Sequence, residues 1–296
     1  MKRVLLFLLT NLAILLVLGV VADLTGLDAW LARQGGSLGG LLAFAACFGF
    51  GGALLSLAMS KWIARRTLGV RVIEIPSNAT EQWLTGAVQT LAMRAGIRTP
   101  EVGVFESPQP NAFATGARRD AALVAVSTGL LQSMDRDQLE AVLGHEITHV
   151  ANGDMVTLTL IQGVVNTFVI FLARLVGNVV DRGGTSRDGA GPGAAYFVTV
   201  MVAQAVLGVL ASMIVMAFSR RREFRADAGG ARLAGRAAMI GALERLQAAH
   251  DDPLPSQMAA FGIAGGEGGG LRRLFMSHPP LSERIAALRS ASLQGS

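Results

Sequence analysis

Apolar residues are unevenly distributed along the chain, with long apolar stretches separated by polar regions. The stretches are Val4–Ala22, about Gly35–Ser60, about Met155–Val180 and Ala194–Ser219. A helix needs about 20 apolar residues to cross the hydrocarbon core of a bilayer, so each stretch can supply one span. The first follows Lys2 and Arg3 as a signal peptide would. Its apolar run exceeds the usual ~7–15 residues, which favours an uncleaved span.

Basic residues next to these stretches predict an orientation, because lysine and arginine mark the cytoplasmic flanks of spans. They gather at Lys2/Arg3, Lys61/Arg65/Arg66 and Arg220/Arg221/Arg222. The connections 23–34 and 181–193 have no positive excess. The pattern therefore predicts two membrane hairpins, with both termini and both large polar regions on the cytoplasmic side.

The third stretch is the least apolar, because it contains Gln162, Asn166 and Arg174. Arg174 can extend to the outer interface or face a polar cavity, and the end of the stretch soon after it favours the interface. A transporter needs ionisable or helix-breaking residues deep in several spans, so this single stretch gives that class little support.

The two polar regions predict a domain of mixed helix and strand. Asn78 with Glu81, and Asp135 with Gln138, are helix-start signals. The expected helices run to Ala95, to about Gly153, over most of Glu223–Ala249 and over about Leu281–Ser290. The expected strands are Arg71–Ile75, Glu101–Phe105, Ala112–Thr115 and Ala121–Ser127. Gly262–Gly270 is glycine-rich and is expected to form a loop that could act as a lid.

Composition supports a membrane protein with a polar domain: 51% of residues are hydrophobic and 16% charged. The mean hydropathy is +0.47 and the pI about 10.5. Nucleic-acid binding is disfavoured, because the basic residues lie beside apolar stretches and no binding motif accompanies them. The single cysteine, Cys47, excludes an intrachain disulfide and a zinc site made of thiolates.

The segment Leu143–Val150 carries the candidate chemistry, since it reads Leu-Gly-His-Glu-Ile-Thr-His-Val. On a helix, His145 and His149 lie one turn apart on one face and can reach one zinc ion at ~2.0–2.1 Å. Glu146 can reach a metal-bound water, as a general base must. The alternative is a helix with two satisfied histidines. Apolar neighbours already give this helix a core face, so packing does not require the polar residues.

A third metal ligand is needed, and Glu223 is the best candidate in the sequence. Glu223 and Asp227 share a helical face, so Glu223 can bind the metal while Asp227 orients a ligand histidine. The alternative is that both acids only balance the arginines around them. Glu223 lies just after the fourth apolar stretch, and His145 lies just before the third. This placement favours the interpretation that Glu223 binds the metal.

These residues, in order, resemble the HtpX family of membrane-bound zinc metalloproteases, relatives of the eukaryotic CAAX-prenyl endoproteases. The resemblance rests on His145–His149, Glu223–Asp227, and His278-Pro279-Pro280 with Arg284, combined with four spans. It implies a gluzincin-type fold, a bacterial inner-membrane location, an active site on the cytoplasmic face, and quality control of misfolded or damaged membrane proteins. Processing of a lipidated tail, as in the CAAX relatives, ranks lower, because four spans are too few for a large chamber.

The resemblance also assigns roles to residues. It implies that one Zn²⁺ per chain is held by His145, His149 and Glu223, with Glu146 as base and Asp227 behind a ligand. His278 could stabilise the oxyanion, with Arg284 beside it; the alternative is that His278 caps the last helix and Arg284 pairs with an acid such as Asp227. The substrate would lie along Asn111, Ala112 and Phe113, unless these form an ordinary half-buried strand.

The expected fold is a mainly α membrane protein, with four transmembrane helices and an α+β metallopeptidase domain. The expected parts are a membrane hairpin at 1–60, the HExxH part at 61–154, a second hairpin at 155–219 and the third-ligand part at 220–296. The expected partners are the lipid bilayer and protein substrates, and the sequence is compatible with an oligomer. A sensor with structural zinc is the remaining rival, but such sites have four protein ligands and no adjacent base.

Overall fold

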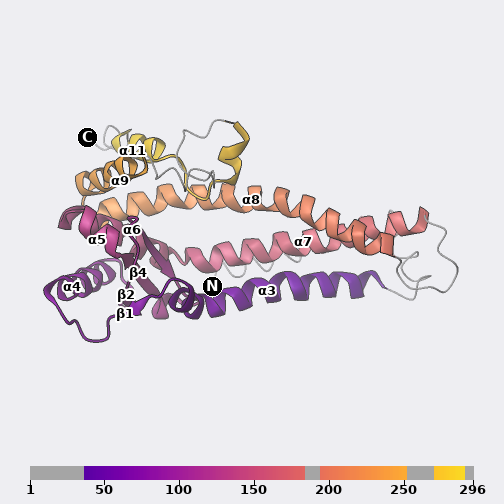
Figure 1. Cartoon of the computed structure of the whole chain (residues 1–296), viewed down its shortest axis with the longest axis horizontal. Coiled ribbons are helices and arrows are strands. Elements are labelled where there is room, and N and C mark those ends of the chain that lie inside the picture. The colour runs from indigo at the N-terminus through magenta and orange to yellow at the C-terminus, as the bar shows by residue number, and fades with distance from the viewer. Residues whose placement is uncertain (1–36, 184–193, 252–269, 291–296) are drawn as a thin grey trace. The chain divides into compact units, whose positions relative to one another are not determined.

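The computed structural model describes residues 37–183, 194–251 and 270–290 (Figure 1). The first apolar stretch, Val4–Ala22, lies outside these residues, as does the glycine-rich segment up to residue 269. The chain divides into two compact units, Met1–Ser56 with Leu158–Val215 and Leu57–Thr157 with Met216–Ser296. The second unit contains the short strands and the motif residues.

Three of the described helices are long and apolar enough to cross a membrane, and they coincide with three of the four expected spans. They are α3 (Leu38–Thr67), α7 (Asp154–Gly183) and α8 (Ala194–Ala234). Helix α8 continues through Arg220, where the sequence analysis placed a boundary between parts of the chain. Its apolar segment and the acidic residues Glu223 and Asp227 therefore belong to one helix.

Within the first unit, α3 and α7 lie side by side (Figure 1), and glycine allows them to approach closely. A Cβ at Gly49 would lie 2.7 Å from the backbone nitrogen of Thr167 on α7, and one at Gly163 would lie 2.6 Å from the Phe50 ring. Small residues at such contacts are typical of helix packing in membranes. Arg174 places its guanidinium carbon 3.9 Å from the centre of the Phe44 ring, a cation–π contact.

The second unit contains a sheet of four strands in the order β1-β2-β4-β3. The strands are β1 (Arg71–Val72), β2 (Glu101–Phe105), β3 (Ala112–Thr115) and β4 (Leu123–Ser127). Strands β2 and β4 are parallel, whereas β1 and β3 run antiparallel to their neighbours. Strand β3 therefore forms one edge of the sheet.

Two strands are shorter than the sequence predicts. Strand β1 ends at Val72 and not at Ile75, although Ile73 N still donates to Val102 O of β2 at 2.8 Å. The strand expected from Ala121 starts at Leu123 because Arg119–Ala121 forms a 3₁₀ turn, η1.

Helices α4 (Ala79–Arg94), α5 (Thr128–Ser133) and α6 (Arg136–Asn152) pack against the sheet, and α6 carries the two motif histidines. The second unit also contains α9 (Arg236–Asp251), the 3₁₀ helix η2 (Gly270–Phe275) and α11 (Leu281–Ser290). The expected helix over Glu223–Ala249 is divided between α8 and α9 at Gly235, whose φ of 103° breaks it. The sequence analysis did not predict α5 or η2.

Helix α6 has well-defined ends and a buried apolar face. Asp135 and Gln138 form the expected capping box, and Gly153 closes the helix in the left-handed conformation, with φ 65°. Leu143 and Ile147 pack into the main core, which also takes in residues of α4, α9, α11, β2 and β4. The motif helix is thus fixed at both ends and along one side.

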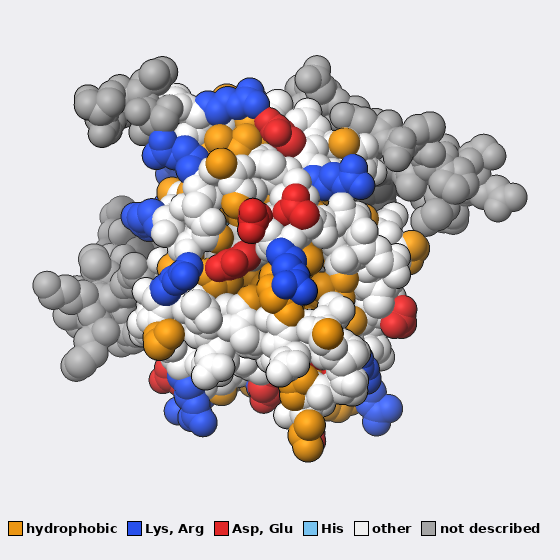
Figure 2. Space-filling model, turned by 90° about the vertical axis from the view of Figure 1, so that its left-hand side faces the viewer, with side chains coloured by type: hydrophobic (Ala, Val, Ile, Leu, Met, Phe, Trp, Pro, Cys, Tyr) orange, Lys and Arg blue, Asp and Glu red, His pale blue; other side chains and the backbone are white. Residues whose placement is uncertain are grey.

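Charged side chains of both signs share the face of the molecule near α4 and α5. Figure 2 shows Asp and Glu lying among Lys, Arg and hydrophobic side chains on this face. Such mixing differs from the one-sign stripe that marks a nucleic-acid-binding surface.

Candidate active site

The site forms where α6 crosses α8, at a contact between backbones that only small residues allow. A Cβ at Gly144 would lie 3.3 Å from Gly230 Cα, and one at Gly230 would lie 3.0 Å from the backbone nitrogen of His145. A Cβ at Gly229 would overlap the Thr148 side chain. Glycine inside a helix costs about 1 kcal/mol relative to alanine. The close crossing is what brings acidic residues of α8 within reach of the histidines of α6.

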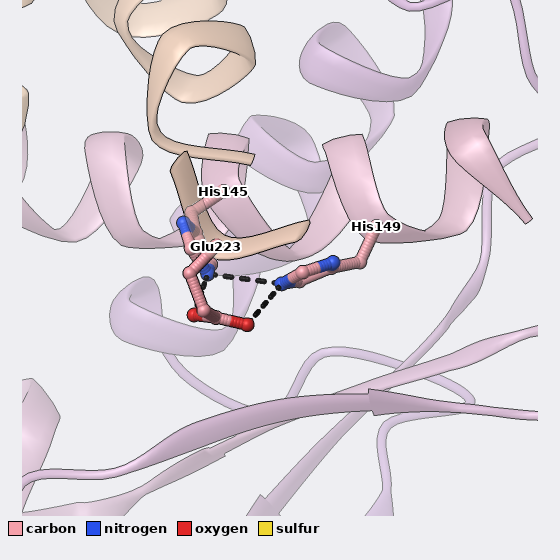
Figure 3. Close-up of side chains that lie close together, drawn as sticks. All are labelled: His145, His149 and Glu223. Atoms are coloured by element: carbon pink, nitrogen blue, oxygen red, sulfur yellow. Dashed lines mark hydrogen bonds and ion pairs between the residues drawn. The ribbon is translucent and has the colours of Figure 1, made fainter. Parts of the chain in front are cut away.

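Three side chains from these helices converge on one point, as Figure 3 shows. His145 Nε2 lies 3.1 Å from His149 Nε2. The two carboxylate oxygens of Glu223 lie 3.4 Å from His145 Nε2 and 3.3 Å from His149 Nε2. All three residues are buried, with Glu223 only 1% exposed. The structure thus brings together the three residues that the sequence analysis expected to bind metal.

The spacing of these atoms fits a tetrahedral metal ion. Ligand atoms at ~2.0–2.1 Å from a tetrahedral centre lie about 3.3 Å from one another. The two imidazole nitrogens lie 3.1 Å apart, and each lies 3.3–3.4 Å from a different carboxylate oxygen of Glu223. Two imidazoles and one carboxylate are donors that suit zinc and leave a fourth position open. The triad could therefore hold a metal ion.

Asp227 orients His145 from behind, as expected, and is itself held by Arg284. The Nδ1 atom of His145 lies 2.9 Å from Asp227 Oδ1. Arg284 donates to both Asp227 oxygens, at 2.8 and 2.6 Å, and lies 3.7 Å from Glu223 Oε2. Burial lowers the pKa of Arg284, but Asp227 raises it by more, so the net shift is upward and Arg284 stays charged. Arg284 thus balances the buried acids.

Asp154 orients His149 in the same way, and the sequence analysis did not identify it. Its Oδ2 lies 2.7 Å from His149 Nδ1, and the residue is 3% exposed. Asp154 begins α7, directly after Gly153 ends α6, so the turn between the helices brings its carboxylate back to the histidine. Arg222 Nη1 donates to the Asp154 carbonyl at 3.0 Å, which ties this turn to α8. In the sequence, Asp154 could have been identified as an isolated acidic residue at the start of an apolar stretch.

These carboxylates shift the pKa of both imidazoles upward in the metal-free protein. Burial lowers the pKa of His145, but hydrogen bonds with Asp227 and Glu223 outweigh it, and the net shift is upward. Burial likewise opposes the shift at His149, where Asp154 and Glu223 raise the pKa to about 9. A metal ion binds neutral imidazole, so an ion that enters this site displaces protons.

The remaining polar residues expected at the site lie around the triad. His278 Nδ1 is 2.7 Å from Glu223 Oε2, and the His278 side chain is 59% exposed. Glu146 is only partly buried, unlike the three ligands, and its charge acts on both ligand histidines. His278 therefore contacts Glu223, and Arg284 pairs with Asp227, as one of the two expectations for Arg284 had it.

The expected substrate residues lie on and before the edge strand β3. Asn111 precedes the strand and is exposed, whereas Ala112 and Phe113 are half-buried. Helix α6 packs against β3, and Ala112 faces the core that α6 shares. Phe113 faces the other side of the sheet, with its ring centre 5.6 Å from that of Phe105. Within the described residues, no hydrogen bond joins these residues to the triad.

Comparisons with known proteins agree with this geometry. The profile of Peptidase family M48 matches residues 78–292. The chain is 62% identical to a protease HtpX homolog of Thiobacillus denitrificans, over 98% of this chain and 99% of the relative. It is 61% identical to protease HtpX of Thioalkalivibrio sulfidiphilus, over 98% and 99%. The crystal structure of S. mikatae Ste24p matches with a TM-score of 0.61 at 19% identity, covering 96% of this chain and 67% of that one.

The structural match establishes the fold, which is mostly helical with a small sheet. The apolar helices and the relatives together identify a multi-pass membrane protein whose substrates are proteins. A match over most of the chain and relatives at about 60% identity establish the family. The chain therefore belongs to peptidase family M48, among the membrane metalloproteases named HtpX.

Proposed function

We propose that this protein is a zinc-dependent endopeptidase that binds one Zn²⁺ through His145, His149 and Glu223. The observation that carries the proposal is the convergence of two buried imidazole nitrogens, 3.1 Å apart, on a buried carboxylate whose oxygens lie 3.3–3.4 Å from them. Zinc is preferred because two imidazoles and a carboxylate, each imidazole backed by its own acid, match catalytic zinc sites. Structural zinc sites usually have four protein ligands, which disfavours a purely structural role.

Glu146 is the proposed general base. It follows His145 on α6 and is more exposed than the ligands, so a water molecule and a peptide can reach it. When bound, zinc supplies Lewis acidity, which acidifies water and polarises a carbonyl group. Glu146 accepts the proton of the attacking water and passes it to the leaving amine.

The substrate is proposed to pair with the free edge of β3 in an extended conformation. Ser127 N donates to Asn111 O at 2.8 Å, so Asn111 and Ser127 form a hydrogen-bonded pair. Such pairs alternate along antiparallel strands, so the N–H and C=O groups of Ala112 and Ala114 point away from β4. These groups can bind the main chain of an unfolded peptide beside α6, as other sheet edges do.

His278 and Arg284 are proposed to support the reaction from the C-terminal side of the site. The hydrogen bond between His278 Nδ1 and Glu223 leaves Nε2 for the developing oxyanion. Arg284 keeps Asp227 ionised in a buried setting and lies 3.7 Å from Glu223 Oε2, and Asp227 fixes the tautomer of His145. Removing Arg284 should therefore affect metal binding more than removing His278.

The proposed setting is a bacterial inner membrane, with the site and both termini on the cytoplasmic side. The support is the basic clusters at Lys61–Arg66 and Arg220–Arg222 next to the apolar helices. Apolar segments of misfolded or damaged membrane proteins are the proposed substrates. In this proposal 61–154 and 220–296 form the protease, and 1–60 and 155–219 form the membrane hairpins.

Cleavage of unfolded casein by detergent-purified protein tests the assignment. Glu146→Gln should retain about one zinc per chain and lose at least 100-fold in activity, because the base contributes about 10²–10⁴-fold. Glu140→Gln is the matched control, since Glu140 lies on the same helix and pairs with Arg94 at 3.6 Å, outside the site. It should cleave like the wild type.

The outcomes separate the competing functions. Zinc retention with loss of cleavage in Glu146→Gln alone supports the metal and base assignment. Equal cleavage by Glu146→Gln and the wild type would refute the base assignment. If the wild type binds zinc and cleaves neither casein nor an unfolded membrane-protein fragment, a structural or sensing role for the metal gains support.

A further inference from the structure

The loop that leads into β3 is held by a turn on the neighbouring strand. Residues 106–111 connect β2 to β3 and are mostly exposed, so they bury little that would fix them. The turn Ser127-Thr128-Gly129, at the end of β4 and the start of α5, contacts this loop at several points. Each member of the turn does so through a different group.

Ser127 binds the end of the loop through its hydroxyl group, which is fully buried. Its Oγ accepts the N–H of Asn111 at 2.9 Å and donates to the carbonyl of Gln109 at 2.8 Å. The same oxygen accepts the N–H of Leu130 at 3.0 Å and so caps α5. One hydroxyl thus joins the helix start to the residue that precedes the edge strand.

Thr128 and Gly129 bind the beginning of the same loop. Thr128 Oγ1 accepts the N–H of Ser107 at 3.2 Å and donates to its carbonyl at 3.1 Å. Gly129 N donates to the same carbonyl at 2.8 Å, and a Cβ at Gly129 would overlap the backbone of Pro108. The glycine is therefore needed for the loop to lie this close.

Strand β3 depends on this support because it has four residues and pairs only with β4 among the described strands. An edge strand this short contributes few hydrogen bonds of its own, and its outer groups at Ala112 and Ala114 must stay in line for a peptide to pair with them. Binding sites need such support to keep their geometry.

We propose that Ser127, Thr128 and Gly129 are positioning residues that align β3 for peptide binding, without contacting the substrate or the metal. The inference rests on the proposed function, because it assumes that the free edge of β3 binds the substrate. If this is so, disrupting the turn raises KM and leaves kcat unchanged. A saturating peptide can align the edge itself, whereas a dilute peptide cannot.

Steady-state cleavage of fluorogenic casein by Ser127→Ala and Thr128→Val tests the proposal. Each variant should raise KM about fivefold to tenfold, with kcat within about twofold and zinc content unchanged. Amide hydrogen exchange of residues 111–115, measured without substrate, should be faster. Ser133→Ala is the matched control, because Ser133 lies in α5 and its hydroxyl bonds only Leu130 O, at 3.4 Å.

Wild-type KM and exchange in both variants would overturn the proposal, as would an equal rise for Ser133→Ala. If Ser127→Ala loses zinc or does not fold, Thr128→Val decides, since its isosteric change leaves the α5 cap in place. Ala114→Pro separates this inference from the proposed function, because it removes one outward N–H of the edge. If Ala114→Pro has a normal KM, the proposal that the substrate binds the edge of β3 is refuted. If its KM is raised while the Ser127 and Thr128 variants have normal KM values, only the positioning role of the turn is refuted.

Discussion

Two helix crossings in this protein depend on glycine, but the side chains that surround them differ. In the second unit, α6 meets α8 at Gly144, Gly229 and Gly230, among buried charged residues. In the first unit, α3 meets α7 at Gly49 and Gly163, against Thr167 and Phe50. Both crossings thus bring two helices close together, but only the α6–α8 crossing, among the described residues, surrounds the contact with buried charged side chains.

The two crossings should respond differently to displacement. At the α6–α8 crossing, moving one helix separates His145 from Asp227 and leaves Arg284 partly unpaired. A buried charge without its partner costs about 3–5 kcal/mol. At the α3–α7 crossing the loss is mainly packing, about 1–3 kcal/mol for an overpacked contact.

The largest effect is expected for Gly229→Ala. The new methyl group would overlap Thr148, whose hydroxyl is held by Gly144 O at 2.7 Å, so α8 must move away from α6. We expect zinc affinity to fall at least 100-fold, measured by competition with a chelator. Gly208→Ala on the same helix is the control, since in the described part of the chain no atom of another element lies within 4 Å of a Cβ placed there, and it should bind zinc normally.

Adding Thr148→Ala to Gly229→Ala should restore part of the zinc affinity, because it removes two of the three overlapping atoms. Undiminished affinity in Gly229→Ala alone would mean that the crossing tolerates the methyl group and that glycine is not what sets the ligand geometry.

The next largest effect compares the two acids behind the ligand histidines. Asp227→Ala removes the partner of His145 and both short hydrogen bonds of buried Arg284, whereas Asp154→Ala removes only the partner of His149. Loss of such a partner costs about 10–100-fold in metal affinity. We expect both variants to lose that much, and only Asp227→Ala to lower the melting temperature markedly in the metal-free state.

The double variant Asp227→Ala with Arg284→Met distinguishes the causes. It should recover the melting temperature but not the zinc affinity, because the unpaired charge is gone while His145 still lacks its acceptor. Equal melting temperatures for the single Asp227 and Asp154 variants would argue against a special role for Arg284.

Gly49→Ala should have a smaller effect, confined to the first unit. Its methyl group would meet the backbone of Thr167, so α3 and α7 must separate. We expect a lower melting temperature in detergent with unchanged zinc affinity. Gly51→Ala on the same helix has free space around its Cβ and should leave the melting temperature unchanged or raise it. Lost zinc affinity in Gly49→Ala would contradict the separation between the crossings.

Features fixed by local rules were predictable from the sequence. The capping box at Asp135, the stop at Gly153 and the strand Glu101–Phe105 follow from neighbouring residues alone. The histidine pair follows from helical periodicity. Glu223 was inferred from its place after an apolar stretch, and the structure brings it to the histidines.

Features that depend on distant parts of the chain were not predictable. Asp154 acts because a turn folds it back onto His149, and its position at the head of an apolar stretch resembles an ordinary helix start. The role of Gly229 depends on which helix crosses it. The helix α5 is only six residues long and owes its start to Ser127, which the sequence analysis assigned to a strand.

The smallest effect is expected at a buried carboxylate outside both crossings, at the start of α4. The Ser77 backbone N–H and Arg71 hold the pKa of Glu81 at about 2. Because this pKa is lower in the folded state than in the unfolded chain, the contribution to stability is present above about pH 4.5. It is lost as the pH falls toward 2. The melting temperature of Glu81→Gln should therefore lie below that of the wild type at pH 6, and this gap in melting temperature should close on acidification.

Asn78→Ala removes the cap of the same helix without removing a titratable group, so its gap to the wild type should not depend on pH. If both gaps close together, the acid sensitivity belongs to the helix start as a whole. If only the Glu81 gap closes, a buried carboxylate here stabilises the fold through Arg71 and the Ser77 N–H. At the α6–α8 crossing, by contrast, the carboxylates contact imidazoles that could hold a metal ion.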